Sequence, residues 1–99
     1  MVQYMQEITF EWDSNKAQTN ERKHGISFEE AETAFYDRNA RVSYDPDHSQ
    51  DEDRYLLLGL SESCGLIVVC HVYRHNDTYI RIFSARRATK TEQQQYQGF

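Results

Sequence analysis

Arginine and aromatic residues alternate through the segment from Val72 to Arg87, which holds the side chains best suited to chemistry. A guanidinium group binds phosphate through two parallel hydrogen bonds, and an aromatic ring stacks on an unpaired base. A strand pair that interleaves the two is typical of a surface that binds single-stranded RNA. The alternative is an exposed sheet face with ordinary surface charges. The residues concerned are Arg74, Tyr79, Arg81 and Phe83.

The charge of the chain is distributed unevenly. The 99 residues carry a net charge of −5, which argues against a protein that coats nucleic acid. Residues 1–53 hold 5 Lys/Arg against 13 Asp/Glu, whereas residues 54–99 hold 6 against 3. A local cationic surface is therefore compatible with an acidic total, and the acidic half is suited to a basic partner.

Length and hydropathy indicate one domain, spanning residues 1–99. No apolar run reaches the 18 or so residues that a membrane span needs. The segment from Met1 to Phe10 lacks the basic start of a signal peptide. Cys64 and Cys70 fit neither a metal motif nor a disulfide framework and are expected to be free thiols.

Periodicity and capping residues predict the order strand, helix, helix, four strands, helix. Asp13 is an N-cap and Gly25 a helix end, and Ser27 with Glu30 forms a capping box, as does Thr89 with Glu92. Short turns between the four consecutive strands predict an antiparallel sheet, with the helices on one face. The expected strands cover residues 8–12, 41–44, 55–61, 66–74 and 79–85, and the expected helices begin at residues 14, 27 and 89.

The turn at Asn76-Asp77 decides which face the arginines take. A loop with an even number of residues pairs Arg74 with Tyr79, Val72 with Arg81 and Cys70 with Phe83, and opposed residues share a face. The other face has the longer apolar run, so the helices should cover it. Its expected members are Ile67, Val69, His71, Tyr73, Ile80, Ile82 and Ser84, whereas Val68, Cys70, Val72, Arg74, Tyr79, Arg81 and Phe83 would face solvent or a ligand.

Two sequence blocks resemble the BrnT family of type II toxins. The first runs from Trp12-Asp13 through Lys23-His24-Gly25-Ile26-Ser27-Phe28-Glu29-Glu30-Ala31 to Asp37. The second is Ile80-Arg81-Ile82-Phe83-Ser84-Ala85-Arg86-Arg87-Ala88-Thr89, followed by Glu92 and Tyr96. The two blocks stand in the order expected of the family, and the resemblance extends from about Phe10 to Tyr96.

The resemblance implies an α+β, RelE-like fold, with a four- to five-stranded antiparallel sheet, two N-terminal helices and one C-terminal helix. It implies a cytoplasmic bacterial ribonuclease that needs no metal or other cofactor and inhibits translation. It also implies a partner, a BrnA-type antitoxin that binds operator DNA and represses the operon together with the toxin. Operator DNA would be reached only through the antitoxin.

The implied reaction begins when a base takes the proton of a ribose 2′-OH, and cations stabilise the phosphorane that follows. Arg74 and Arg81 would clamp the phosphate, and Lys23 or His24 would transfer a proton. His48 is a further candidate, for RNA binding or as an acid or base. The full set of candidates is Lys23, His24, Arg54, Arg74 and Arg81 for catalysis, Tyr79, Phe83, Arg86 and His48 for RNA binding, and Glu29, Glu30 and Glu32 for antitoxin binding.

Several assignments have a structural alternative. Lys23 and His24 would also suit the C-terminal end of a helix, and Arg86 and Arg87 would also hold the last helix in place.

His71 and His75, four residues apart on a strand, lie roughly 13 Å from each other, too far to share one metal ion. The alternative function is a catalytically inactive module that binds the antitoxin and acts only in transcriptional autoregulation.

Overall fold

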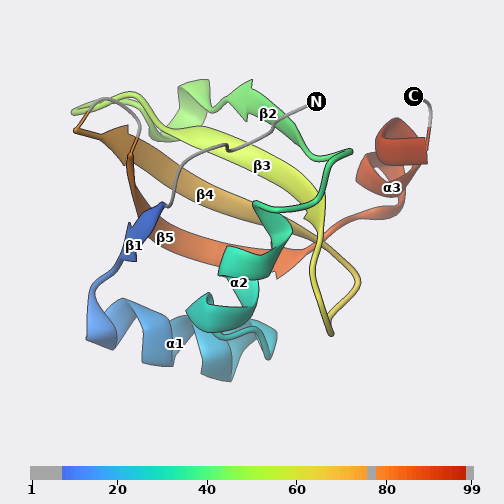
Figure 1. Ribbon diagram of the computed structural model, residues 1–99, viewed down its shortest axis with the longest axis horizontal. Coiled ribbons are helices and arrows are strands. Elements are labelled where there is room, and N and C mark those ends of the chain that lie inside the picture. The colour runs from blue at the N-terminus through green and yellow to red at the C-terminus, as the bar shows by residue number, and fades with distance from the viewer. Residues whose placement is uncertain (1–7, 76–77, 98–99) are drawn as a thin grey trace.

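The computed structural model describes residues 8–75 and 78–97 (Figure 1). The predicted order of elements is confirmed, although the Asn76-Asp77 turn and residues 1–7 lie outside the described part. Strand β5 continues to Arg87, beyond the predicted end at Ala85. The elements are β1 (Thr9–Glu11), α1 (Ser14–His24), α2 (Phe28–Ala34), β2 (Arg41–Tyr44), the 3₁₀ helix η1 (Pro46–His48), β3 (Tyr55–Leu60), β4 (Leu66–Arg74), β5 (Tyr79–Arg87) and α3 (Lys90–Gln97).

The five strands form one sheet in the order β1-β5-β4-β3-β2. Strands β2 to β5 are joined by short connections and pair antiparallel, as predicted. Strand β1 pairs parallel with β5, so the prediction of a wholly antiparallel sheet is wrong at this edge. The short-turn argument could not reach β1, because two helices separate it from the next strand in the sequence.

The helix ends follow their capping residues. The Asp13 carboxylate accepts from the Lys16 backbone N–H, and Gly25 ends α1 at φ 71°, a conformation that favours glycine. The Ser27 hydroxyl accepts from the Glu30 N–H. Gly59 lets α2 approach β3, because a Cβ atom there would lie only 2.8 Å from the Ala34 carbonyl oxygen.

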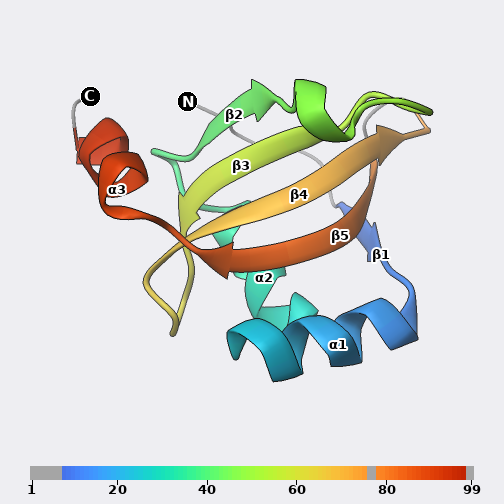
Figure 2. The same ribbon diagram turned by 180° about the vertical axis from the view of Figure 1, so that it is seen from behind.

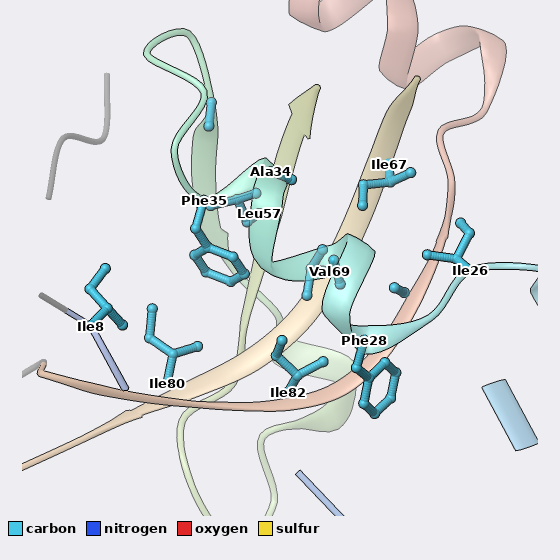
Figure 3. Close-up of a cluster of buried hydrophobic side chains, with 13 residues drawn as sticks. Ile8, Ile26, Phe28, Ala34, Phe35, Leu57, Ile67, Val69, Ile80 and Ile82 are labelled. Carbon is cyan, nitrogen blue, oxygen red and sulfur yellow. The ribbon is translucent and has the colours of Figure 1, made fainter. Parts of the chain in front are cut away.

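The hydrophobic core lies between α2 and the sheet (Figure 3). Phe28 and Phe35 are fully buried, and the Phe28 ring meets Trp12 edge to face. His71 is buried in the same layer against Phe35, and burial lowers its pKa to about 4. The fully buried aliphatic residues of this layer are Ile26, Leu57, Ile67, Val69 and Ile80.

The opposite side of the sheet is not covered by α1 or α2, and it is called the open face below (Figure 2). The predicted pairs Arg74 with Tyr79 and Val72 with Arg81 are confirmed. The predicted pair Cys70 with Phe83 is wrong, because a β-bulge pairs Cys70 with Ser84 and leaves Phe83 as an extra residue.

The bulge also corrects the face assignment beyond Phe83. Ser84 shares the open face with Cys70 rather than the covered face, and Ala85 takes the fully buried place. Without the bulge, period-2 alternation would put Arg86 on the same face as Ile82, in the core. The extra residue therefore brings Arg81 and Arg86 onto the same face of β5.

Helix α3 lies at one end of the sheet beside β2 and β3, apart from α1 and α2 (Figures 1 and 2). The prediction of all helices on one face is thus wrong for α3. Arg86 holds the helix through two hydrogen bonds to Glu92, at 2.8 and 2.9 Å. The Tyr96 hydroxyl donates to Asp37 at 2.6 Å, and burial together with that bond raises the pKa of Tyr96 to about 12.

Candidate functional site

One row of neighbouring residues runs across the open face, through β1, β5 and β4 and then through the residues that adjoin β3 and β2. Glu11 pairs with Arg81 on β5, and Arg81 pairs with Val72 on β4. Arg54 directly precedes Tyr55, which pairs with His71, so the row passes from Val72 to Arg54. The Arg54 carbonyl then accepts from the N–H of Asp45. Two arginines therefore flank the small apolar Val72, with a carboxylate beyond each of them.

Arg54 reaches from the start of β3 across β4. Its guanidinium carbon lies 4.0 Å from the centre of the Phe83 ring on β5, a cation–π contact. Its Nε is buried and has no hydrogen-bond partner among the described residues.

Arg74 and Arg81 share one carboxylate. Glu11 lies 3.6 Å from Arg74 Nε and 3.9 Å from Arg81 Nη1, and Glu52 lies 3.2 Å from Arg74 Nη2. All four side chains are about one-third exposed. Exposed pairs at these distances contribute little to stability, so both arginines can turn to another anion at small cost.

A buried carboxylate holds His48 at the rim of the open face. Asp45 is 5% exposed, and its Oδ2 lies 2.8 Å from His48 Nδ1 and 4.0 Å from Cys70 Sγ. The His48 side chain itself is 65% exposed. The Ser49 hydroxyl donates to the Asp45 carbonyl and accepts from the Arg54 N–H, which closes the loop between the two residues.

Burial raises the pKa of the Cys70 thiol, and the neighbouring Asp45 carboxylate adds to this effect. The Arg54 guanidinium opposes both. Cys70 is therefore a protonated thiol at neutral pH, and it lies beside Asp45 and Arg54. Cys64 and Cys70 are both free, as predicted.

A second groove runs between α1 and the bulge of β5. Lys16 Nζ lies 5.1 Å from the centre of the Phe83 ring, on the α1 side. Lys23 and His24 line the same groove near Ser84. They lie toward the C-terminal end of α1, whereas Glu11 and Arg81 lie beside its start. The structure thus does not bring Lys23 and His24 into the row that contains Arg54 and Arg81.

The remaining RNA-binding candidates differ in their surroundings. Tyr79 is 37% exposed and stacks edge to face on His75, so its ring is accessible at the end of β5. Arg86 is bonded to Glu92, which favours the structural alternative for this residue. Phe83 lies between Arg54 and Lys16, at the bulge of β5 and beside α1.

Of the three glutamates predicted to bind the antitoxin, one has a structural role. The Glu30 carboxylate accepts from the backbone N–H groups of Ser63 and Cys64, and the bond from Ser63 is the main cause that lowers its pKa. Glu29 is exposed. Burial, with a smaller contribution from Glu29, raises the pKa of Glu32.

Sequence reasoning missed Glu11, Asp45 and Lys16 as members of the site. The sequence did contain a signal for Glu11. Phe10 packs against the core, and alternation along β1 puts the next residue, Glu11, on the other face of the sheet. Asp45 belongs to the sequence Asp45-Pro46-Asp47, which is typical of a turn and gives no sign of a site residue. Its contact with Cys70 depends on the pairing of β2 with β3, which a local pattern does not specify.

Two kinds of feature are absent from residues 8–75 and 78–97. No group of three or more His, Cys, Asp or Glu side chains in these ranges could hold a metal ion. No helix within them is long and apolar enough to cross a membrane.

The fold is that of a small α+β ribonuclease toxin. The chain is similar to the crystal structure of the Brucella abortus ribonuclease toxin BrnT, with a TM-score of 0.63 and 25% sequence identity, over 84% of this chain and 99% of that one. Comparison with curated proteins gives no match. The model of the family described as the ribonuclease toxin BrnT of type II toxin–antitoxin systems matches residues 12–92, and the chain belongs to this family.

Proposed function

We propose that this ribonuclease toxin cleaves RNA without a metal ion, at the row formed by Glu11, Arg81, Val72, Arg54 and Asp45. The observation that carries the proposal is the pair of arginines on either side of Val72. Neighbouring strands are about 4.8 Å apart, so the two Cα atoms lie roughly 10 Å apart and their long side chains can converge on one phosphate. The Arg54 guanidinium, which lies over the Phe83 ring on β5, supports this position for the anion.

The reaction follows from the charge arrangement. Deprotonation of a ribose 2′-OH lets its oxygen attack the adjacent phosphorus, and negative charge develops on the phosphorane oxygens. Arg54 and Arg81 stabilise that charge from two sides, and Arg74 adds a third guanidinium one diagonal away. The P–O5′ bond breaks in line with the attack, and O5′ takes up a proton. The products are a 2′,3′-cyclic phosphate and a free 5′-OH. Tyr79 offers its ring to a neighbouring base, and Phe83, between Arg54 and Lys16, supports the Arg54 guanidinium.

Loss of intact message would inhibit translation in the bacterial cytoplasm, the location that we propose for the toxin. Its partner would be a BrnA-type antitoxin, which would repress the operon together with it and contact operator DNA on behalf of both. We propose that the antitoxin docks on the outer side of α2 and on the surface just beyond its C-terminal end. Glu29 and Glu32 are available there, and Tyr36 and Leu60 are 58% and 52% exposed.

The test is cleavage of a labelled RNA by the purified toxin in excess EDTA, with mass spectrometry of the product ends. The proposal predicts cleavage with 2′,3′-cyclic phosphate ends. Activity that requires an added divalent ion, or products with 5′-phosphate ends, would contradict it. Ribosomes should be added in a parallel reaction, because a toxin that acts only on translated message would cleave in that reaction alone.

One observation favours the alternative of a non-catalytic module. Arg74 and Arg81 already pair with Glu11 and Glu52, and the chain is acidic overall, so its non-specific attraction for RNA is weak. A soluble toxin that binds the antitoxin, yet cleaves no RNA with or without ribosomes, would establish this alternative.

A further inference from the structure

The proposed reaction needs two proton transfers on opposite sides of one phosphate. The attacking 2′-oxygen and the departing 5′-oxygen stand on opposite sides of the phosphorus in an in-line displacement, so base and acid must also lie on opposite sides. Arg54 and Arg81 mark where the phosphorus would lie. The groups that flank these arginines are therefore the candidates for proton transfer.

On the β1 side the flanking group is Glu11. Its carboxylate contacts Arg81 and Arg74, which keeps it beside the phosphate site without burying it. A carboxylate oxygen is a proton acceptor, so Glu11 carries the chemical group that a general base needs. When a phosphate replaces it as the partner of these arginines, Glu11 is free to accept the 2′-OH proton.

On the β2 side the flanking group is His48. The Asp45 carboxylate contacts Nδ1 of its ring, which favours a proton on Nδ1 and leaves Nε2 for exchange with a ligand. The ring is solvent-accessible, and the Ser49 hydrogen bonds keep its loop beside Arg54.

We propose that Glu11 is the general base and His48 the general acid of this ribonuclease, with Asp45 as the residue that positions His48. The inference rests on the proposed function and assigns its two proton carriers. The 2′-OH proton passes to the Glu11 carboxylate as the O2′–P bond forms. His48 gives its Nε2 proton to O5′ as the P–O5′ bond breaks. Exchange with water then restores both groups, and Lys23 and His24 transfer no proton.

The experiment compares two RNA substrates that differ in one atom. Both contain the step that the wild-type toxin cleaves, and in one of them sulfur replaces the bridging 5′-oxygen. A thiolate leaves without protonation, so this substrate needs no general acid. We expect His48→Asn to slow cleavage of ordinary RNA by about 10²- to 10⁴-fold and to cleave the sulfur substrate within a few-fold of the wild-type rate. His75→Asn, at an exposed histidine with φ 53° that asparagine tolerates, is the matched control.

Each outcome decides between the assignments. Equal losses on both substrates, or no loss on ordinary RNA, would overturn the role of His48 as acid. A wild-type toxin that cleaves neither substrate would instead refute the proposed function. Melting temperatures equal to that of the wild type would show that His48→Asn is folded, as expected for an exposed side chain.

The base is tested by the pH dependence of the same rates. Glu11→Gln should cleave at least about 10²-fold more slowly at neutral pH. Its rate should then rise in proportion to hydroxide concentration, because hydroxide replaces the missing base. A variant with the wild-type rate, or with a reduced rate that follows the wild-type pH profile, would overturn the assignment.

Discussion

The two halves of β5 use arginine in opposite ways. Arg81 and Arg86 point to the same open face, yet Arg86 makes two short hydrogen bonds to Glu92, whereas Arg81 lies 3.9 Å from Glu11. The first geometry is a bidentate ion pair that fixes a helix, and the second is a loose contact that a ligand can replace. The tightness of pairing thus separates a structural arginine from one that is available for a phosphate.

The largest effect on RNA cleavage is expected from a substitution of Arg81. We expect Arg81→Ala to reduce RNA cleavage by about 10²- to 10³-fold, because one of the cations that stabilise the phosphorane is lost. Its free energy of unfolding should change by less than about 1 kcal/mol, since the contact with Glu11 is exposed. Cleavage rates and urea unfolding of the same preparation check both. Wild-type activity in this variant would place the phosphate elsewhere.

Arg86→Ala should show the reverse pattern. Loss of the pair with Glu92 releases α3, and we expect the free energy of unfolding to fall by about 1–2 kcal/mol. The rate of RNA cleavage by the folded fraction should stay within a few-fold of wild type. A large loss of activity in a fully folded variant would mean that Arg86 contacts RNA, as the sequence pattern also allowed.

Acid should weaken the structural half of β5 in a defined range. The hydrogen bond from Arg86 is the main cause that lowers the pKa of Glu92 to about 2, from an ordinary value of 4.5. Because the folded pKa is depressed, the stabilisation is complete above about pH 4.5 and is lost as the pH falls toward 2. Glu92→Gln should therefore be less stable than the wild type by about 1 kcal/mol at pH 7. Urea unfolding should show this difference disappear by pH 2, and a difference independent of pH would contradict the account.

The smallest effect is expected at Phe83. Phe83→Leu keeps an apolar side chain but removes the ring under the Arg54 guanidinium. A cation–π contact contributes about 0.5–1 kcal/mol, so RNA cleavage should fall by about twofold to fivefold. Steady-state kinetics of RNA cleavage measure this loss. If the ring acts through Arg54, the double variant with Arg54→Ala should cleave RNA as fast as Arg54→Ala alone.

Local sequence patterns predicted most of the fold because the deciding interactions are local. Asp13, Gly25 and Ser27 mark the helix ends through neighbours three or four residues away. The parallel pairing of β1 and the bulge at Phe83 were not predicted, because both depend on strand partners that local patterns do not specify. The bulge was the costlier omission, since it decides which face Ser84 and Arg86 take.

The arginines of the candidate site were predicted from the sequence, whereas its carboxylates, and Lys16 on α1, were missed. Arg74 and Arg81 stand out in sequence because charged residues are unusual in apolar strands, and Arg54 was indicated by the resemblance to the family. Glu11 and Asp45 do not stand out, since acidic residues are common throughout residues 1–53. Only the strand order brings β1 and β2, the two edges, into one row with the arginines.

The most direct test of the central claim is ¹⁵N NMR of the arginine Nε–Hε groups during titration with RNA that lacks the reactive 2′-OH. Binding of a phosphate at the proposed row should shift the signals of Arg54, Arg74 and Arg81 and leave Arg86 in place. Shifts confined to Arg86, or to Arg22 beside Lys23 and His24 at the end of α1, would contradict the account and place the phosphate away from the row.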